Sequence, residues 1–279
     1  MIDRTPPAQG SGNHSVDTDA TSPRRIRLRH FIVLVLVYVA SAQVLTILAA
    51  GGHPSQHAEL TSLENIVIRL IVPVGLGSML AVAYVAWSRQ WQPIFVELRR
   101  LPRPVLLVPV TLFILALGIS NYGGLSARGF AFAGLLFVGT MMVGFAEELV
   151  FRGVGVQALR QHGLSESKVA LWSSAIFGVS HGSNAIITGK IVDALIQVVL
   201  TTATGFMFYL VKRGTGALAM AMLFHGLWDF SVLSGHVDPA NPTSLSTIAA
   251  VVLGALLLTA LLLRRQFGLV GSDANPSVR

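Results

Sequence analysis

The chain has 279 residues, of which 53% are hydrophobic and only 12% are charged, and its formal net charge is +7. Its mean hydropathy is +0.67, and the charged fraction is about half that of an average soluble domain, so an ordinary water-soluble globular protein is excluded. The sequence contains no cysteine, which excludes disulfides, thiolate zinc sites and cysteine nucleophiles. Several windows of at least about 18 residues carry almost no charge and are long enough to cross a bilayer as helices. The composition therefore predicts an all-α, polytopic membrane helix bundle.

The N-terminal segment is polar before it becomes apolar. Residues 1–23 are rich in Pro, Gly, Ser and Thr, a composition typical of a disordered tail. The basic and apolar stretch that follows resembles a signal peptide, with Ala40-Ser41-Ala42 as a cleavage site. The apolar run continues to Ala50, however, which favours an uncleaved first membrane helix over cleavage.

We predict about eight membrane-spanning helices along the chain. In order, they are Phe31–Ala50, Ile66–Trp87, Val105–Asn121, Phe130–Val150, Val169–Ile187, Ile191–Val211, Ala217–Leu233 and Thr247–Leu263. This divides the chain into a cytoplasmic tail with a basic juxtamembrane segment (1–30), N-terminal membrane helices (31–128), a membrane core (129–233), and a last helix with a short tail (234–279).

The basic residues alternate with the predicted spans. Seventeen of the 20 lysines and arginines lie before the first span or after the second, fourth, sixth and eighth spans. This is the positive-inside pattern, so we expect an integral protein of the plasma membrane with both termini in the cytoplasm. The positive charge thus reflects topology and contact with the lipid bilayer, and we expect no nucleic-acid partner.

Five ionisable side chains fall at membrane depth on the predicted spans. A charge in hydrocarbon costs several kcal/mol and normally faces a bundle interior, a partner or a water-filled cavity. These side chains come from three separate predicted helices and are Glu147, Glu148, His181, His225 and Asp229. Because chance burial of five such groups is improbable, we expect them to form one site.

Helical spacing gives these residues different surroundings. Glu148 and Arg152 are four residues apart, on one helix face, and form an expected ion pair. Glu147 is rotated from Glu148 by about 100°, so it remains a free carboxylate directed at the bundle interior. The same spacing of four places Asp229 beside His225, and it places Phe177 against His181.

Three short motifs carry these residues in order. They are "EELVFR" with Glu147, Glu148 and Arg152, "FGVSH" with Phe177 and His181, and "HGLWD" with His225 and Asp229. In this the sequence resembles the CPBP family of intramembrane proteases, whose motifs are Glu-Glu-x-x-x-Arg, Phe-x-x-x-His and His-x-x-x-Asn/Asp. That family includes the type II CAAX prenyl endopeptidases and the Abi, or bacteriocin-processing, proteins. The resemblance covers about Phe130 to Leu233.

The resemblance implies a role for each residue. Glu147 would activate the attacking water with help from His181, while His225 and Asp229 would hold or polarise the scissile carbonyl. The Glu148–Arg152 pair would brace its helix. CAAX-processing members usually carry Asn at the position of Asp229, and an ionised carboxylate would repel an oxyanion there. Asp229 must therefore be protonated, hydrogen-bond to His225 or ligate a metal.

The cofactor and the function each retain alternatives. Glu147, His181, His225 and Asp229 could also ligate zinc or another divalent ion, so metal-free and metal-dependent catalysis both stay open.

We predict an endopeptidase acting on protein or peptide substrates at the membrane. A non-catalytic scaffold or immunity protein and a proton-coupled transporter are the alternatives, since buried Glu, His and Asp also form proton relays. The complete set of acid, base and donor candidates argues against the scaffold. The lack of inverted repeats or of proline in spans four to seven argues against the transporter.

Overall fold

The computed structural model describes residues 22–49, 60, 62–237, 253, 254, 257 and 261. Regular structure in these residues is helical, apart from one isolated β-bridge between Val96 and Ala217. The elements are α1 (Leu28–Ala49), α2 (Leu63–Ile66), η3 (Val67–Ile71), α3 (Val72–Ser88), α4 (Trp91–Phe95), η4 (Arg103–Leu106), α5 (Leu107–Ile119), α6 (Tyr122–Arg128), α7 (Phe130–Glu148), η5 (Leu149–Gly155), α8 (Val156–Gln161), α9 (Glu166–His181), α10 (Asn184–Thr188), α11 (Ile191–Thr215) and α12 (Leu218–Ser234).

Several helices have the length and composition of membrane spans. Four qualify within the described residues, namely Leu28–Leu48, Leu63–Ser88, Phe130–Gln161 and Ile191–Thr215. The bent pair Arg103–Ile119 and Tyr122–Arg128, with an angle of 57°, makes up to five. Large apolar side chains on outward faces are exposed, as at Leu107 (66%) and Val199 (69%), which suits contact with lipid. The chain is an all-helical integral membrane protein.

One of the eight predicted spans is divided in the structure, and another cannot be compared. The prediction of one helix over Val169–Ile187 is wrong at its end, because α9 stops at His181 and the separate short helix α10 follows. Ser183 turns its hydroxyl back to the carbonyl of Ser180, and Gly182 is the C-cap of α9. Helix α12 has 17 residues, which is the length predicted for the span Ala217–Leu233. Most of the predicted eighth span and of the predicted disordered tail lies outside the described residues.

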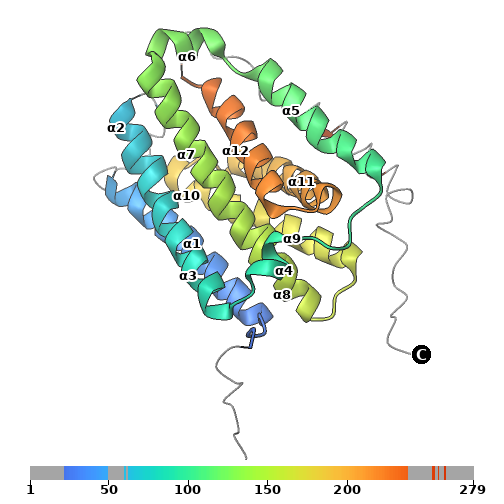
Figure 1. The fold of residues 1–279 in the computed structure, drawn as a ribbon. Helices are drawn as coiled ribbons and strands as arrows, with labels where there is room; N and C mark the ends of the chain where they lie inside the picture. Colours follow the sequence, from blue (N-terminus) through green and yellow to red (C-terminus); the bar gives the residue numbers. More distant parts are fainter. Residues whose placement is uncertain are drawn as a thin grey trace, which may run out of the picture.

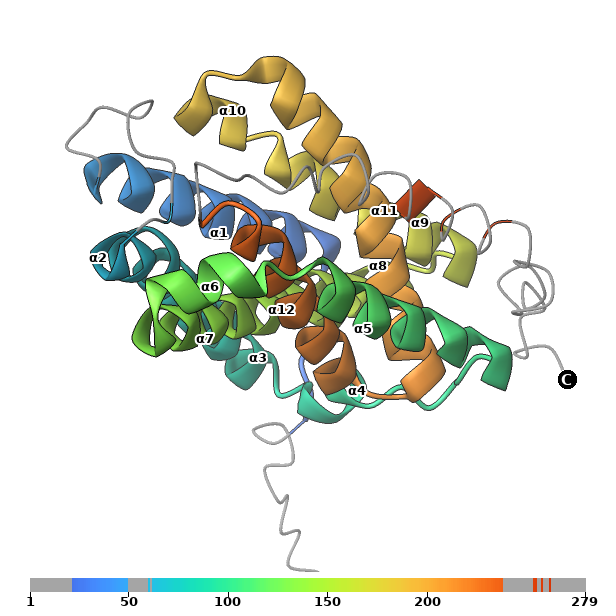
Figure 2. The same ribbon diagram turned by 90° about the horizontal axis from the view of Figure 1, so that it is seen from above.

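Helix α7 runs through the middle of the molecule, with α3 on one side and α12 on the other (Figure 1). Viewed from above, α9 and α11 form a second packed pair, and α11 also packs against α12 (Figure 2). Glycines allow both close approaches. A Cβ atom on Gly144 of α7 would clash with the backbone of Met222 in α12, and one on Gly178 of α9 would clash with Thr202 in α11. Sequence positions beside these glycines are therefore brought to the centre of the bundle.

Candidate active site

The first motif lies where α7 changes from α-helix to π-helix. Helix α7 ends at Glu148, and the chain continues without a break as the π-helix η5. Arg152 Nη1 lies 3.0 Å from Glu148 Oε1, and both side chains are completely buried. The widened turn also leaves the carbonyl of Arg152 to accept a hydrogen bond from Lys212 Nζ at 2.8 Å. Such π-helical segments are common at functional sites.

Glu148 has a second partner that the sequence did not predict. Nδ1 of His225, on α12, lies 2.9 Å from the same Oε1 atom that contacts Arg152. A carboxylate paired with arginine is ionised and can only accept, so the imidazole donates this hydrogen bond from Nδ1. Its Nε2 can therefore donate in another direction only when the ring is doubly protonated.

Glu147 faces two imidazoles from different helices. Its Oε2 lies 3.7 Å from Nε2 of His225 and 3.9 Å from Nε2 of His181. Asp229 Oδ2 lies 3.4 Å from the same nitrogen of His225. Oε2 of Glu147 is buried and has no hydrogen-bond partner among the described residues. The structure thus gathers all four candidate catalytic side chains, from α7, α9 and α12.

These four side chains line one cavity. Its volume is about 400 Å³, and Glu147, His181, His225 and Asp229 all contribute to its wall. The volume falls in the range of pockets that hold small ligands or a few residues of a peptide, roughly 300–1,000 Å³. Apolar side chains from η3, α3 and α11 form part of the remaining lining, together with polar side chains that include Asn184, Gln197 and His236. The four candidate catalytic groups therefore converge on a mainly apolar space.

Aromatic rings fix the two histidines. The ring of Phe177 meets that of His181 edge-on at 4.7 Å, and the guanidinium carbon of Arg152 lies 4.1 Å from the centre of the same phenyl ring. Phe208, on α11, stacks against His225 at 4.4 Å. Stacking and cation–π contact compensate for guanidinium nitrogens of Arg152 that lack hydrogen bonds. Sequence analysis missed Phe208 and Lys212, because α11 carries no motif and one aromatic or basic residue in an apolar helix gives no distinct signal.

The donor atoms do not form a metal centre in this arrangement. Among the described residues, no group of three or more His, Asp or Glu side chains is placed so that it could hold a metal ion. We therefore derive no step through a metal.

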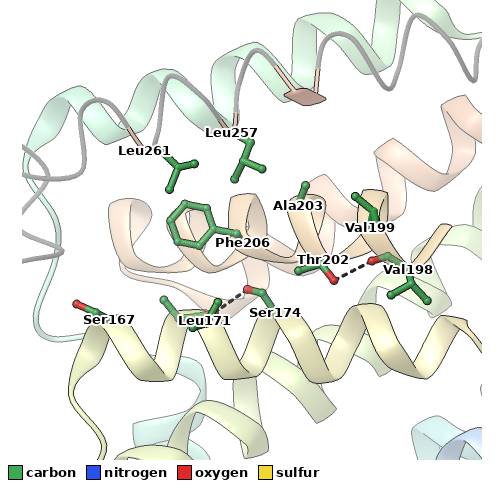
Figure 3. A pocket seen from close by; sticks show the side chains of 11 residues that line it. Ser167, Leu171, Ser174, Val198, Val199, Thr202, Ala203, Phe206, Leu257 and Leu261 are labelled. Atoms are coloured by element: carbon green, nitrogen blue, oxygen red, sulfur yellow. Dashed lines mark hydrogen bonds between the residues drawn. The ribbon is translucent and has the colours of Figure 1, made fainter. Parts of the chain in front are cut away.

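A larger cavity on the far side of α9 is chemically different. It measures about 590 Å³ and lies between α9, α11 and the described residues Leu257 and Leu261 (Figure 3). Its two central hydroxyls, those of Ser174 and Thr202, each donate to a backbone carbonyl of their own helix at 2.7 Å. Among the described residues that line it, none is titratable. This cavity therefore suits an apolar chain.

A charged network joins α8, α9 and α11 to the segment after α4. Arg160 contacts Glu97 at 2.7 Å and Glu166 at 2.6 Å, and Arg213 also pairs with Glu166. The hydroxyl of Tyr209 donates to Glu166 at 2.6 Å. Burial alone would raise the pKa of Glu166, but these hydrogen bonds and positive charges lower it below its ordinary value.

Comparison with known proteins agrees with the geometry. Residues 129–231 match the family model described as type II CAAX prenyl endopeptidase Rce1-like. This segment is thus similar to the Rce1-like family. It contains all three motifs and every residue of the cavity named above as a candidate catalytic group. No curated protein matches the chain. The resemblance drawn from the three motifs is therefore confirmed, while the role of each residue remains a prediction.

Proposed function

We propose that this protein is an intramembrane endopeptidase that hydrolyses peptide bonds of membrane-associated proteins or peptides. The observation that carries the proposal is the buried Oε2 of Glu147, which faces both imidazoles across a cavity inside a membrane bundle. The Rce1-like match points to a CAAX-type protease, so peptides with a prenylated C-terminal CAAX sequence are the first substrate class to test.

Glu147 acts as the general base in this proposal. The carboxylate removes a proton from a water molecule while the water oxygen bonds to the scissile carbonyl carbon. His181 holds that water from the other side, since its Nε2 lies 3.9 Å from Oε2 of Glu147 and leaves room for a bridging molecule. The C–N bond then breaks, and the proton passes from Glu147 to the leaving amine. The net reaction adds one water across the peptide bond.

His225 and Asp229 stabilise the oxyanion. Glu148 accepts the Nδ1 proton of His225, so Nε2 is the atom that turns toward the cavity. As the imidazolium, His225 donates from Nε2 to the developing negative charge. Asp229, at 3.4 Å from Nε2, shares that proton or donates its own when it is protonated. The mainly apolar walls of the cavity make each of these interactions stronger than in solvent.

The proposal keeps the predicted topology of about eight spans with both termini in the cytoplasm. On that topology the core, residues 129–233, holds the site, and Glu147 lies near the cytoplasmic end of its span. A substrate would then enter from the cytoplasmic half of the bilayer. Adding a protease-sensitive tag at either terminus of the protein in sealed, inside-out vesicles tests this orientation directly.

Activity is tested on a library of internally quenched peptides, with and without an S-farnesylated CAAX end. Purified wild-type protein in liposomes should produce two fragments whose combined mass exceeds that of the peptide by one water. The Glu147→Ala variant should produce none. If folded wild-type protein cleaves neither the farnesylated nor the unmodified peptides, the result would favour the alternative of a non-catalytic scaffold.

A further inference from the structure

Tyr38 lies at the active site although it comes from the first helix. Its side chain, on α1, is only 6% exposed and belongs to the same buried cluster as Val143 and Ala146, which neighbour Glu147 on α7. Tyr38 precedes the family-matched segment, 129–231, by about 90 residues and belongs to none of the three motifs. A phenol buried at membrane depth normally finds an acceptor for its hydroxyl proton, and the Glu147 carboxylate is an acceptor near enough to influence it.

The ring of Tyr38 is held by a glycine on α3. A Cβ atom added to Gly77 would clash with Cε2 and Cδ2 of the Tyr38 ring, so only glycine leaves room for it. Gly75, two residues earlier on the same helix, has no such role, because a Cβ atom there would meet only Met142 at an ordinary 3.6 Å. The packing of α1 against α3 therefore fixes the position of the Tyr38 ring.

Glu147 needs such a partner. Its nearest imidazole nitrogens, at 3.7 and 3.9 Å, are beyond hydrogen-bonding distance. A glutamate side chain has several rotatable bonds, and a general base must be held to within about 0.5 Å of its working position. A phenol can donate but cannot compete with the carboxylate for the proton at neutral pH, because its ordinary pKa is about 10.

We infer that Tyr38 is a positioning residue of the proposed peptidase, whose hydroxyl donates to Glu147 and keeps Oε2 of that carboxylate directed between His181 and His225. This inference rests on the proposed function. It assigns the N-terminal helices, which the family match does not cover, a direct part in the chemistry. Tyr38 does not need to touch the substrate for this role.

The first test removes only the hydroxyl. Tyr38→Phe should lower kcat by about 10- to 100-fold per folded molecule and change KM by less than about threefold, because the base is misplaced while the substrate cavity is intact. Tyr84→Phe is the matched control, since Tyr84 lies on α3 against His30 and Trp87, away from Glu147. It should keep wild-type kinetics.

The second test moves the ring without changing it. Gly77→Ala should reduce kcat as Tyr38→Phe does, whereas Gly75→Ala should not. In the double variant, Gly77→Ala should add less than about a twofold loss to that of Tyr38→Phe, because both changes act through one hydrogen bond. If Gly77→Ala fails to fold, the Tyr38→Phe kinetics alone decide.

All variants are assayed on a peptide that wild-type protein cleaves. If wild type cleaves no peptide, the proposed function fails. If wild type cleaves and Tyr38→Phe has wild-type kcat per folded molecule, only the inference about Tyr38 is overturned. A Tyr38→Phe protein that is less stable but equally active when folded overturns it as well.

Discussion

Glu148 and His225 are joined by a hydrogen bond of 2.9 Å between Oε1 and Nδ1, although 77 residues separate them in the chain. The same oxygen contacts Arg152 at 3.0 Å. One carboxylate therefore ties the π-helical end of α7 to α12 and determines which nitrogen of His225 faces the cavity. Glu148 serves the site as well as its own helix.

Glu148→Gln should weaken both the fold and the activity. The amide can still accept from His225, but it leaves the completely buried Arg152 without its counter-charge. Breaking a buried ion pair by changing one partner costs about 3–5 kcal/mol. We expect a lower folded yield and a lower Tm in detergent. Glu64→Gln, at an exposed glutamate of α2, should leave both unchanged.

The Asp229→Asn variant distinguishes two possible roles of Asp229, that of a hydrogen-bond donor and that of a metal ligand. If Asp229 acts as a protonated donor beside Nε2 of His225, the amide can replace it. We then expect most of the activity to remain and the wild type to resist chelators. A chelator-sensitive wild type together with an inactive Asn variant that excess zinc partly restores would instead assign Asp229 to a metal.

Gly144→Ala should separate α7 from α12. Its new methyl group would collide with the backbone of Met222 and Gly226, which cannot move as a side chain would. Overpacking of this kind typically costs about 1–3 kcal/mol. Gly134→Ala, on the same helix but with nothing within 4 Å, is the control. Thermal unfolding of the two variants should differ clearly, and equal Tm values would contradict the close packing.

Acid should weaken the charged network around Glu166. Its pKa is lowered in the folded state, so its contribution to stability is present above the unfolded pKa and is lost as pH falls through the folded one. Glu166→Gln should therefore lower Tm at neutral pH by about 2–4 °C for each 1 kcal/mol lost. The difference from wild type should disappear at low pH. If the Tm difference between wild type and Glu166→Gln stayed constant from neutral to acid pH, the stabilising role of ionised Glu166 would be refuted.

The sequence predicted which ionisable side chains lie together better than it predicted where the helices end. Burial of charge is costly in lipid, so Glu147, His181, His225 and Asp229 were recognisable from hydropathy and i, i+4 spacing alone. The family match over 129–231 contains all four residues. The break after His181 was missed, because the residues of α10 are apolar enough to continue the helix and only the geometry at Gly182 and Ser183 ends it.

Contacts between distant helices could not be predicted. The bond from Glu148 to His225 depends on how α12 is rotated against α7. The stacking of Phe208 on His225 depends on α11 in the same way. The place of Tyr38 beside Glu147 depends on the close contact with Gly77, which has no pattern in the sequence. Each is a property of packing and not of spacing along one helix.

The central claim is that Glu147 activates the water that cleaves the peptide bond. The most direct measurement is the single-turnover rate of a cleaved peptide by folded wild-type, Glu147→Gln and Glu64→Gln proteins in liposomes. Our account predicts that Glu147→Gln retains its fold and binds the peptide but loses cleavage by at least about 100-fold, while Glu64→Gln cleaves at the wild-type rate. Normal turnover by Glu147→Gln would contradict the account.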